Sequence, residues 1–306
     1  MDFSFLLNQD RRLLSIGYNG EEHTLDESCY DLLASEARLT SLFAIAKGDV
    51  RSEHWFRLGR PVTIIRGEAC LVSWSGSMFE YLMPPLVMHE RQGGILNQSN
   101  NLSIDRQIAY GKSLGKPWGI SESAFNARDR ELNYQYHNFG VPGLGLKREL
   151  GSNVVVAPYA SLLASQFRPR EAVKNLSKLA SIGALGTYGY YDAVDFAETR
   201  LPEGQTSAVV RNYMAHHQGM SIAAIGNVVL NGRLRDRFHS DPLIEAAELL
   251  LQERAPREIV PVRTPDTSEP KSSATAELVA ATKYRVIEDP VRAKRSIAVI
   301  SNGIIP

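Results

Sequence analysis

Two glutamates in this sequence stand where a carboxyl group could do acid–base or nucleophilic chemistry. The first, Glu36, shares one face of a predicted helix with Leu32 and Leu39, so a charge interrupts an apolar stripe. Burial would raise the pKa of this carboxyl by desolvation, and a carboxyl that keeps its proton near neutral pH can serve as a general acid. A buried ion pair with Arg38 or another arginine would explain the same pattern equally well.

The second glutamate, Glu122, lies in the string WGISESAF, which starts at Trp118 and leads into a predicted helix. Free backbone N–H groups and the helix dipole at such a start favour an ionised carboxylate. This environment suits a nucleophile or a base. The alternative is a surface acid that only caps the helix.

A third glutamate, Glu80, lies in an apolar run between Trp74 and Pro84 that also contains Tyr81. A carboxylate in such surroundings needs a partner or a ligand, because an unpaired buried charge is costly.

Three tyrosines and two acids lie close together near residue 190, where Tyr188, Tyr190 and Tyr191 precede Asp192 and Asp195. Flat aromatic faces for stacking, combined with acceptors for hydroxyl groups, are the chemistry that sugar sites use. A hydrophobic corner with capping acids is the alternative interpretation.

The adjacent histidines His216 and His217 do not predict a metal site. Neighbouring residues of a helix point about 100° apart, so the two imidazoles would not converge on one ion. Phosphate-binding, dinucleotide-binding and His-Glu-x-x-His signatures are absent from the sequence, so no cofactor is expected.

The composition is that of a globular protein without a polyanionic partner. Thirty-four basic and 34 acidic residues give a formal net charge of +0, which argues against nucleic acid binding. Cys29 and Cys70 are too few for a disulfide framework and favour a reducing compartment. Neither a long apolar run nor an N-terminal leader pattern is present, so we expect a soluble, unprocessed segment.

Helical patterns dominate the first part of the chain, and the character changes after residue 256. Helices are predicted from Glu27 onward and over residues 161–167, 170–179, 207–230 and 242–253. Residues 257–280 are rich in Pro, Ser, Thr and charge and predict a disordered linker. Residues 281–306 contain apolar, strand-like runs and predict the start of a β-rich module.

Six strings in order carry a resemblance to a known family. They are YDLLASEAR from Tyr30, FEYLMP from Phe79, WGISESAF from Trp118, FGVPGLGLKR from Phe139, YMAHHQGMS from Tyr213 and ELLLQER from Glu248. Together they closely resemble the glucoamylase-like region of bacterial cyclic β-1,2-glucan synthases, over residues 1–256.

The resemblance implies an all-α domain over residues 1–256, an (α/α)6 toroid. The sequence holds fewer helical patterns than a full toroid needs, so the toroid would be incomplete or compact. The resemblance also implies that the domain belongs to a larger membrane-bound synthase. It would lie between a glucosyltransferase module and a phosphorylase-like module, on the cytoplasmic side of the inner membrane.

The activity implied by the resemblance is retaining transglycosylation that cuts linear β-1,2-glucan and joins its ends. Glu36 would be the acid/base and Glu122 the nucleophile. The cleft would be lined by Glu80, Tyr81, Trp74, Tyr134, Tyr136, Tyr188, Tyr190, Asp192, His216 and His217. A β-1,2-glucan hydrolase and a non-catalytic glucan-holding module remain alternatives. Glu149 departs from the glycine usual in the family after the Lys-Arg pair, which puts the local backbone in question.

Overall fold

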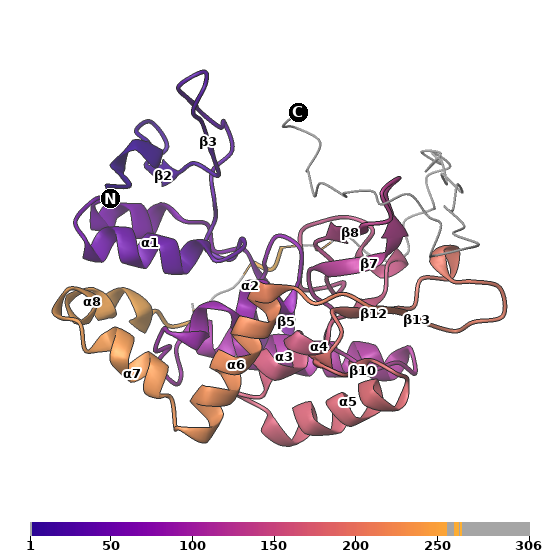
Figure 1. The fold of residues 1–306 in the computed structure, drawn as a ribbon. Coiled ribbons are helices and arrows are strands. Elements are labelled where there is room, and N and C mark those ends of the chain that lie inside the picture. The colour runs from indigo at the N-terminus through magenta and orange to yellow at the C-terminus, as the bar shows by residue number, and fades with distance from the viewer. Residues whose placement is uncertain (1, 256–259, 263, 265–306) are drawn as a thin grey trace.

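Helices form the framework of the molecule, and short β-hairpins lie on its surface (Figure 1). The computed structural model describes residues 2–255, 260–262 and 264. Of the predicted linker, residues 257–280, only 260–262 and 264 are therefore described; there the Val262 N–H donates to the carbonyl of Val62 at 2.7 Å. The predicted β-rich stretch, residues 281–306, lies outside the described residues.

The helical elements follow one another along the whole described chain. The α-helices are α1 (Ala37–Ala46), α2 (Met78–Leu82), α3 (Ile95–Ser113), α4 (Pro158–Ala164), α5 (Pro169–Ser181), α6 (Ala215–Val229), α7 (Arg233–His239) and α8 (Pro242–Ala247). The 3-10 helices are η1 (Ser4–Leu6), η2 (Ser52–Arg57), η3 (Pro84–Leu86), η4 (Leu150–Ser152), η5 (Glu198–Arg200) and η6 (Glu248–Gln252).

The all-α prediction is too narrow, because short antiparallel strands accompany the helices. The hairpins are β1 (Leu7–Asn8) with β2 (Leu13–Leu14), β3 (Tyr18–Asn19) with β4 (Thr24–Leu25), β5 (Val62–Ile65) with β6 (Glu68–Leu71), β7 (Ser123–Arg128) with β8 (Tyr134–His137), and β10 (Leu185–Gly186) with β11 (Gly189–Tyr190). A three-stranded sheet has the order β13 (Ala208–Val210), β12 (Ala193–Asp195), β9 (Val155–Val156). Its strands are rich in valine, a β-branched residue that favours extended backbone.

The helix predictions succeed where local signals are strong. For residues 170–179 the structure has α5, which begins with Pro169 at a first-turn position, carries Glu171 near its start and has Lys178 in its last turn. For residues 242–253 it has α8, whose capping Asp241 accepts from the Leu243 N–H at 2.9 Å, followed by η6. Residues 207–230 divide into β13 and α6.

The prediction of a helix from Glu27 is wrong. The chain forms β4 just before this point and continues without helix until α1 begins at Ala37. Long-range pairing explains the difference: Ser15 bridges Cys29, and the Tyr30 N–H donates to the Leu14 carbonyl at 3.0 Å. The backbone groups of this segment are therefore satisfied by the N-terminal hairpins rather than by a helix.

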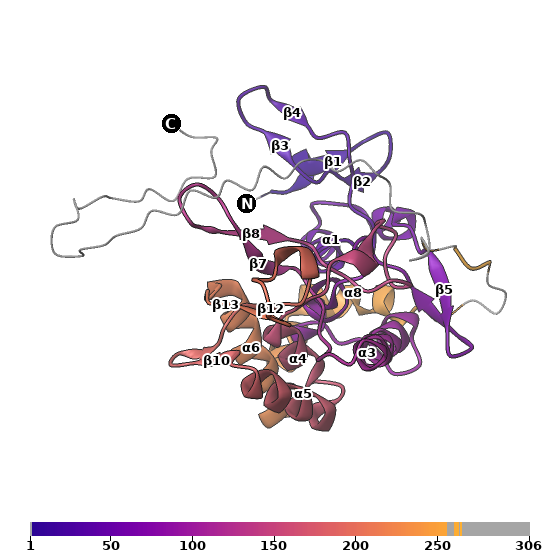
Figure 2. The same cartoon turned by 90° about the vertical axis from the view of Figure 1, so that its right-hand side faces the viewer.

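The interior lies between α4 and its neighbours. Helix α4 packs against α2, α5 and α6, while α1 packs against α8. The β7–β8 hairpin lies beside β12 and β13, above α4, α5 and α6 in the view of Figure 2. Within the described part of the chain, no helix is both long and apolar enough to cross a membrane. Cys29 and Cys70 are both free thiols.

Candidate active site

The loop that carries Glu122 is fixed by two buried amides. Gln107 of α3 accepts from the Ile120 N–H at 2.9 Å and donates to the Ile120 carbonyl at 2.8 Å. Asn175 of α5 does the same for Trp118, accepting at 3.1 Å and donating at 2.7 Å. These side chains replace the backbone partners that an irregular buried segment would otherwise lack.

Tyr159 of α4 attaches this loop to the core. Its hydroxyl donates to the Glu122 carbonyl at 2.9 Å and lies 2.8 Å from the Ser121 hydroxyl. Ser121 in turn accepts from the Phe79 N–H of α2 at 3.0 Å. The backbone of Glu122 is therefore held from both sides, which fixes the direction in which its side chain leaves the loop.

The environment of the Glu122 carboxyl differs from the predicted one. Strand β7 begins at Ser123, so no helix start is present to favour the ionised form. Burial, followed by the charges of Glu80 and Glu36, raises the pKa of Glu122 from 4.5 to about 7. Lys147 and a hydrogen bond from the Tyr136 hydroxyl act in the opposite direction.

Glu36 occupies the position just before α1, on a constrained backbone. The preceding residue, Ser35, has a left-handed φ of 52° and donates its hydroxyl to the Glu36 carboxyl. Backbone in this region is unfavourable for a non-glycine residue and persists only where the surroundings enforce it. One such restraint is the Trp74 N–H, which donates to the Leu33 carbonyl at 3.0 Å.

The ion pair proposed as an alternative for Glu36 is not formed. Arg38 is 0% exposed, and its Nε lies 3.1 Å from Oε1 of Glu90. Its other nitrogens donate to the carbonyls of Glu80 and Tyr81, both at 2.5 Å. The Arg38 guanidinium is thus bonded to Glu90 and to these carbonyls, and it does not pair with the Glu36 carboxyl.

The two candidate carboxyls share their surroundings. The charge of Glu36 acts on Glu122, and both charges act on the hydroxyl of Tyr30. Burial first, then Glu36 and Glu122, raise the pKa of Tyr30. The two predicted catalytic carboxyls therefore lie near enough for their charges to interact, and both act on Tyr30.

A line of hydrogen bonds runs from Glu122 into the core. Tyr136 bonds to Glu122, and its hydroxyl lies 3.3 Å from Nε2 of His217. His217 Nδ1 lies 2.6 Å from Oδ1 of Asp192, and the ring stacks on Tyr159 at 3.8 Å between centroids. Tyr136 has one hydroxyl hydrogen, so its donation to Glu122 or to His217 depends on which of them carries a proton.

Two predicted cleft residues are structural instead. Glu80 is 2% exposed, and its carboxylate accepts from the hydroxyls of Ser73, Ser75 and Ser77 at 2.7, 2.7 and 3.2 Å. Tyr81 is 0% exposed, and its hydroxyl lies 2.8 and 2.9 Å from the carbonyls of Leu71 and Leu144. Both fix the loop before α2 and cannot contact a glucan, because they are enclosed.

Asp192, another predicted cleft residue, is also enclosed at 2% exposed, whereas Trp74 and the remaining predicted tyrosines lie at or near the surface. Trp74 is 55% exposed and Tyr188 is 84% exposed. The hydroxyl of Tyr190 donates to the Leu176 carbonyl at 3.0 Å, whereas Tyr134 accepts from Arg128 at 2.6 Å.

The two adjacent histidines differ in burial. The His217 ring is buried, whereas the His216 ring is exposed and lies 6.2 Å from the Tyr136 ring, between centroids.

Sequence reasoning missed Tyr30, Tyr159 and Lys147 as neighbours of the carboxyl pair. Tyr30 and Lys147 lie within two of the strings that carry the family resemblance, which was the available signal. Tyr159 follows Pro158 at the start of α4 and gave none. Within the described residues, no group of three or more His, Cys, Asp or Glu side chains could hold a metal ion.

The raised pKa of Glu122 makes a prediction about stability. Because the folded chain binds this proton more tightly than the unfolded chain, stability is fully present below the ordinary pKa of 4.5 and falls as the pH rises to about 7. Glu122→Gln removes this loss, which is on the order of 3 kcal/mol. The melting temperature of the variant minus that of the parent should therefore increase between pH 4.5 and about 7 and then level off. A difference that stays constant with pH would contradict the raised pKa.

Comparison with known proteins places this chain in a family. Residues 28–242 match the family described as "Putative glucoamylase". The cyclic β-(1,2)-glucan synthase NdvB of Rhizobium meliloti (strain 1021) is 64% identical over 303 residues. That alignment covers 99% of this chain and 11% of the relative, so the chain spans a small part of the relative's length.

Two solved structures share the fold. An endo-β-1,2-glucanase from Chitinophaga pinensis, in complex with sophorotriose and glucose, has a TM-score of 0.55 and 18% identity, covering 82% of this chain and 61% of that one. A β-1,2-glucanase from Parabacteroides distasonis has a TM-score of 0.58 and 16% identity, covering 82% and 39%. At these identities the likeness concerns the fold alone. With the family match extending from before Glu36 to the end of α7, this chain belongs to the glucoamylase-like family.

Proposed function

We propose that this chain is a glycoside-hydrolase-type domain that joins the ends of linear β-1,2-glucan into a ring by retaining transglycosylation. The observation that carries the proposal is the pair Glu36 and Glu122, two partly buried carboxyls from separate segments whose charges act on each other. Most enzymes that hydrolyse or transfer glycosides use a pair of carboxyl groups. The similarity to NdvB supports β-1,2-glucan as the substrate class.

The reaction divides into two steps that need no external reagent. Glu36 gives its proton to the glycosidic oxygen while the Glu122 carboxylate attacks the anomeric carbon. The bond between this oxygen and the anomeric carbon breaks, the reducing-end fragment leaves with a free 2-hydroxyl, and the rest of the chain stays as a glycosyl ester on Glu122. The 2-hydroxyl at the other end of the same glucan then attacks that carbon, and its proton passes to Glu36. The Glu122 carboxylate is released, and the new β-1,2 bond closes the ring without water.

The raised pKa of Glu122 is compatible with a nucleophile role. It includes the effect of a negative charge on Glu36, and a proton on Glu36, which the acid role requires, removes that charge. The Tyr136 hydrogen bond and the Lys147 charge, which favour the carboxylate, remain in place. This assignment of roles requires one proton on the pair in the reactive state, carried by Glu36.

Exposed aromatic faces near the pair could hold sugar rings. Trp74 and Tyr136 are 55% and 40% exposed, and their backbones are tied to the segments that carry Glu36 and Glu122. Rings stacked there would shield the glycosyl ester from water, which transfer to a hydroxyl requires. We further propose that the domain works within a larger membrane-bound synthase, on the cytoplasmic side of the inner membrane, because the chain spans 11% of NdvB.

The mass of the products tests this function. Linear β-1,2-glucan of defined length is incubated with the purified chain, and products are separated by mass. A ring is lighter than the linear chain of equal length by one water, and it carries no reducing end. Rings that accumulate without new reducing ends are the expected result.

Other outcomes identify the alternatives. Shorter linear chains with new reducing ends would show a β-1,2-glucan hydrolase, in which water replaces the acceptor hydroxyl. Binding of glucan by the folded chain, without any change in its mass distribution, would show a glucan-holding module instead.

A further inference from the structure

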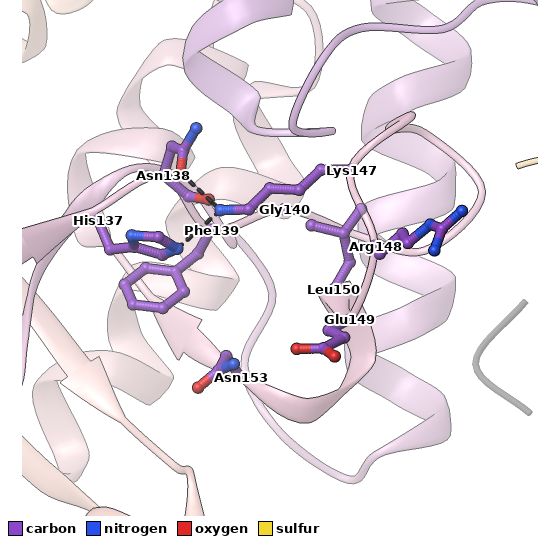
Figure 3. A pocket seen from close by; sticks show the side chains of 9 residues that line it. All are labelled: His137, Asn138, Phe139, Gly140, Lys147, Arg148, Glu149, Leu150 and Asn153. Carbon is purple, nitrogen blue, oxygen red and sulfur yellow. Dashed lines mark hydrogen bonds between the residues drawn. The ribbon is translucent and has the colours of Figure 1, made fainter. Parts of the chain in front are cut away.

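A small pocket opens at the end of the β7–β8 hairpin (Figure 3). Its volume is about 80 Å³. That is room for several waters, since one needs roughly 10–15 Å³ of such space. His137 and Asn138 line one end, where the Lys147 side chain reaches over to them, and Glu149 and Asn153 lie at the other (Figure 3).

The Lys147 side chain is held in one position before any ligand arrives. Its Nζ donates to Asn138 Oδ1 at 2.6 Å and to the Asn138 carbonyl at 3.1 Å, and it lies 2.7 Å from Nε2 of His137. Its backbone N–H donates to the Trp74 carbonyl at 2.9 Å. A side chain fixed in this way loses little further entropy when a ligand binds.

Two glycines lock the loop that leads to Lys147. A Cβ on Gly140 would lie 1.8 Å from the carbonyl oxygen of Ser75, and one on Gly145 would lie 2.6 Å from the carbonyl carbon of Ser75. The backbones of the two loops therefore touch directly. Because the Ser75 loop is itself bound to Glu80, the pocket rests on a rigid support.

The pocket lies next to the proposed nucleophile. Ser123 pairs with His137, one of the residues that line the pocket. Glu122 immediately precedes Ser123, so it lies next to this part of the pocket. The charges of Lys147 and Glu122 act on each other, as expected because the Lys147 side chain reaches His137, at the end of the hairpin next to Glu122. A sugar in the pocket would thus adjoin the bond that Glu122 attacks.

The lining suits the hydroxyl edge of a sugar. The Asn138 amide nitrogen supplies donors, Glu149 supplies acceptors, and the Phe139 ring adds an apolar face. The Asn138 oxygen already accepts from Lys147, and the Asn153 amide is bonded to Arg200 and Ser152. Glu149 has a left-handed φ of 61°, a conformation that is unfavourable for a side chain other than glycine.

Arg148 also lines the pocket, but its guanidinium points away from the other lining side chains (Figure 3). The charges that face the pocket are therefore those of Lys147 and Glu149, which are opposite and favour a neutral polyol over an anion.

We propose that this pocket, the Lys147 pocket, binds one glucosyl unit of the β-1,2-glucan chain beside Glu122, and that Lys147 is a positioning residue that holds its His137–Asn138 wall. The proposal rests on the proposed function, since it names a subsite of the same cleft.

Binding of a linear β-1,2-linked glucotetraose, measured by calorimetry in a Glu122→Gln background, tests the pocket without turnover. Adding Lys147→Met should lower the affinity about tenfold, because the His137–Asn138 wall loses the one or two hydrogen bonds that hold it in position for the sugar. Lys147→Arg keeps the charge and the hydrogen-bond donors and should restore part of the affinity. Lys174→Met, which removes an exposed lysine of α5, is the matched control and should change nothing.

Further measurements separate positioning from general damage. In the chain with Glu122 intact, Lys147→Met should raise KM more than it lowers kcat. Glu149→Gln alters an exposed side chain, so it decides the matter if Lys147→Met does not fold; it should weaken tetraose binding.

Unchanged tetraose affinity in a folded Lys147→Met or Glu149→Gln chain would overturn the pocket while leaving the function intact. Binding of inorganic phosphate that disappears in Lys147→Met would overturn the choice of a sugar. Absence of both binding and turnover in the parent chain would instead contradict the proposed function, and the subsite with it.

Discussion

Replacing Glu122 or Glu36 by alanine is expected to abolish most of the glucan conversion, with different chemical rescue for each. Loss of a general acid typically costs about 10²- to 10⁴-fold in rate, and loss of a nucleophile costs at least as much. Azide should restore turnover of both variants. With Glu122→Ala it should replace the nucleophile and give an α-glucosyl azide, whereas with Glu36→Ala it should attack the glycosyl ester and give a β-glucosyl azide.

The anomeric form of the azide products shows which carboxyl is the nucleophile and which is the acid/base. Interchanged azide anomers would mean that the two carboxyls have exchanged roles, with Glu122 as the acid/base. Glu131→Ala, which removes an exposed acid from the β7–β8 turn, is the matched control and should keep full activity. Full activity in either site variant would remove that residue from the catalytic pair.

Replacing Arg38 by methionine is expected to lower the free energy of unfolding by about 3–5 kcal/mol. The change leaves the buried Glu90 without its cationic partner and the carbonyls of Glu80 and Tyr81 without their donors. Burial raises the pKa of Glu90 and lowers that of Arg38, so each of the two charges depends on the other. The loss is measured from the midpoints of urea unfolding of the variant and the parent, provided that both have the same dependence of the free energy of unfolding on urea concentration.

An exposed ion pair provides the comparison. Arg51 and Glu53 are 2.9 Å apart, but their side chains are 88% and 50% exposed. Arg51→Met should change the free energy of unfolding by less than about 1 kcal/mol. Equal losses for Arg38→Met and Arg51→Met would show that burial of the Arg38 pair is not what makes it important.

Local sequence was sufficient where a segment carries its own signals. Helix α5 has its starting proline, its charged ends and buried residues at helical spacing, such as Ala172 and Leu179, so its bounds could be predicted closely. The role of Glu80 was also within reach. Ser77 and Glu80 form a capping box, whose Ser-x-x-Glu spacing is visible in the sequence.

Elsewhere the deciding partners are distant in sequence. Strand β7 was predicted to be helical, yet its Ala124 and Asn126 N–H groups donate to the carboxylates of Asp192 and Asp195, at 2.7 and 3.0 Å. No local pattern contains that information.

Helix α3 was missed because buried polar residues interrupt its inner face; among them are Asn100, Ser103 and Gln107. Gln107 is one of the side chains that position the Glu122 loop, so the feature that hid the helix belongs to the site.

The central claim is that Glu36 and Glu122 cleave β-1,2-glucan with retention, and methanol as acceptor tests it most directly. The chain is incubated with linear β-1,2-glucan and methanol, and the new chain ends are followed by NMR. A methyl glycoside cannot change its anomeric form in solution, so its configuration records the reaction. The account predicts methyl β-glucoside ends, and none with Glu122→Gln. Reducing ends without methyl glycoside, or an unchanged glucan in the presence of folded protein, would contradict it.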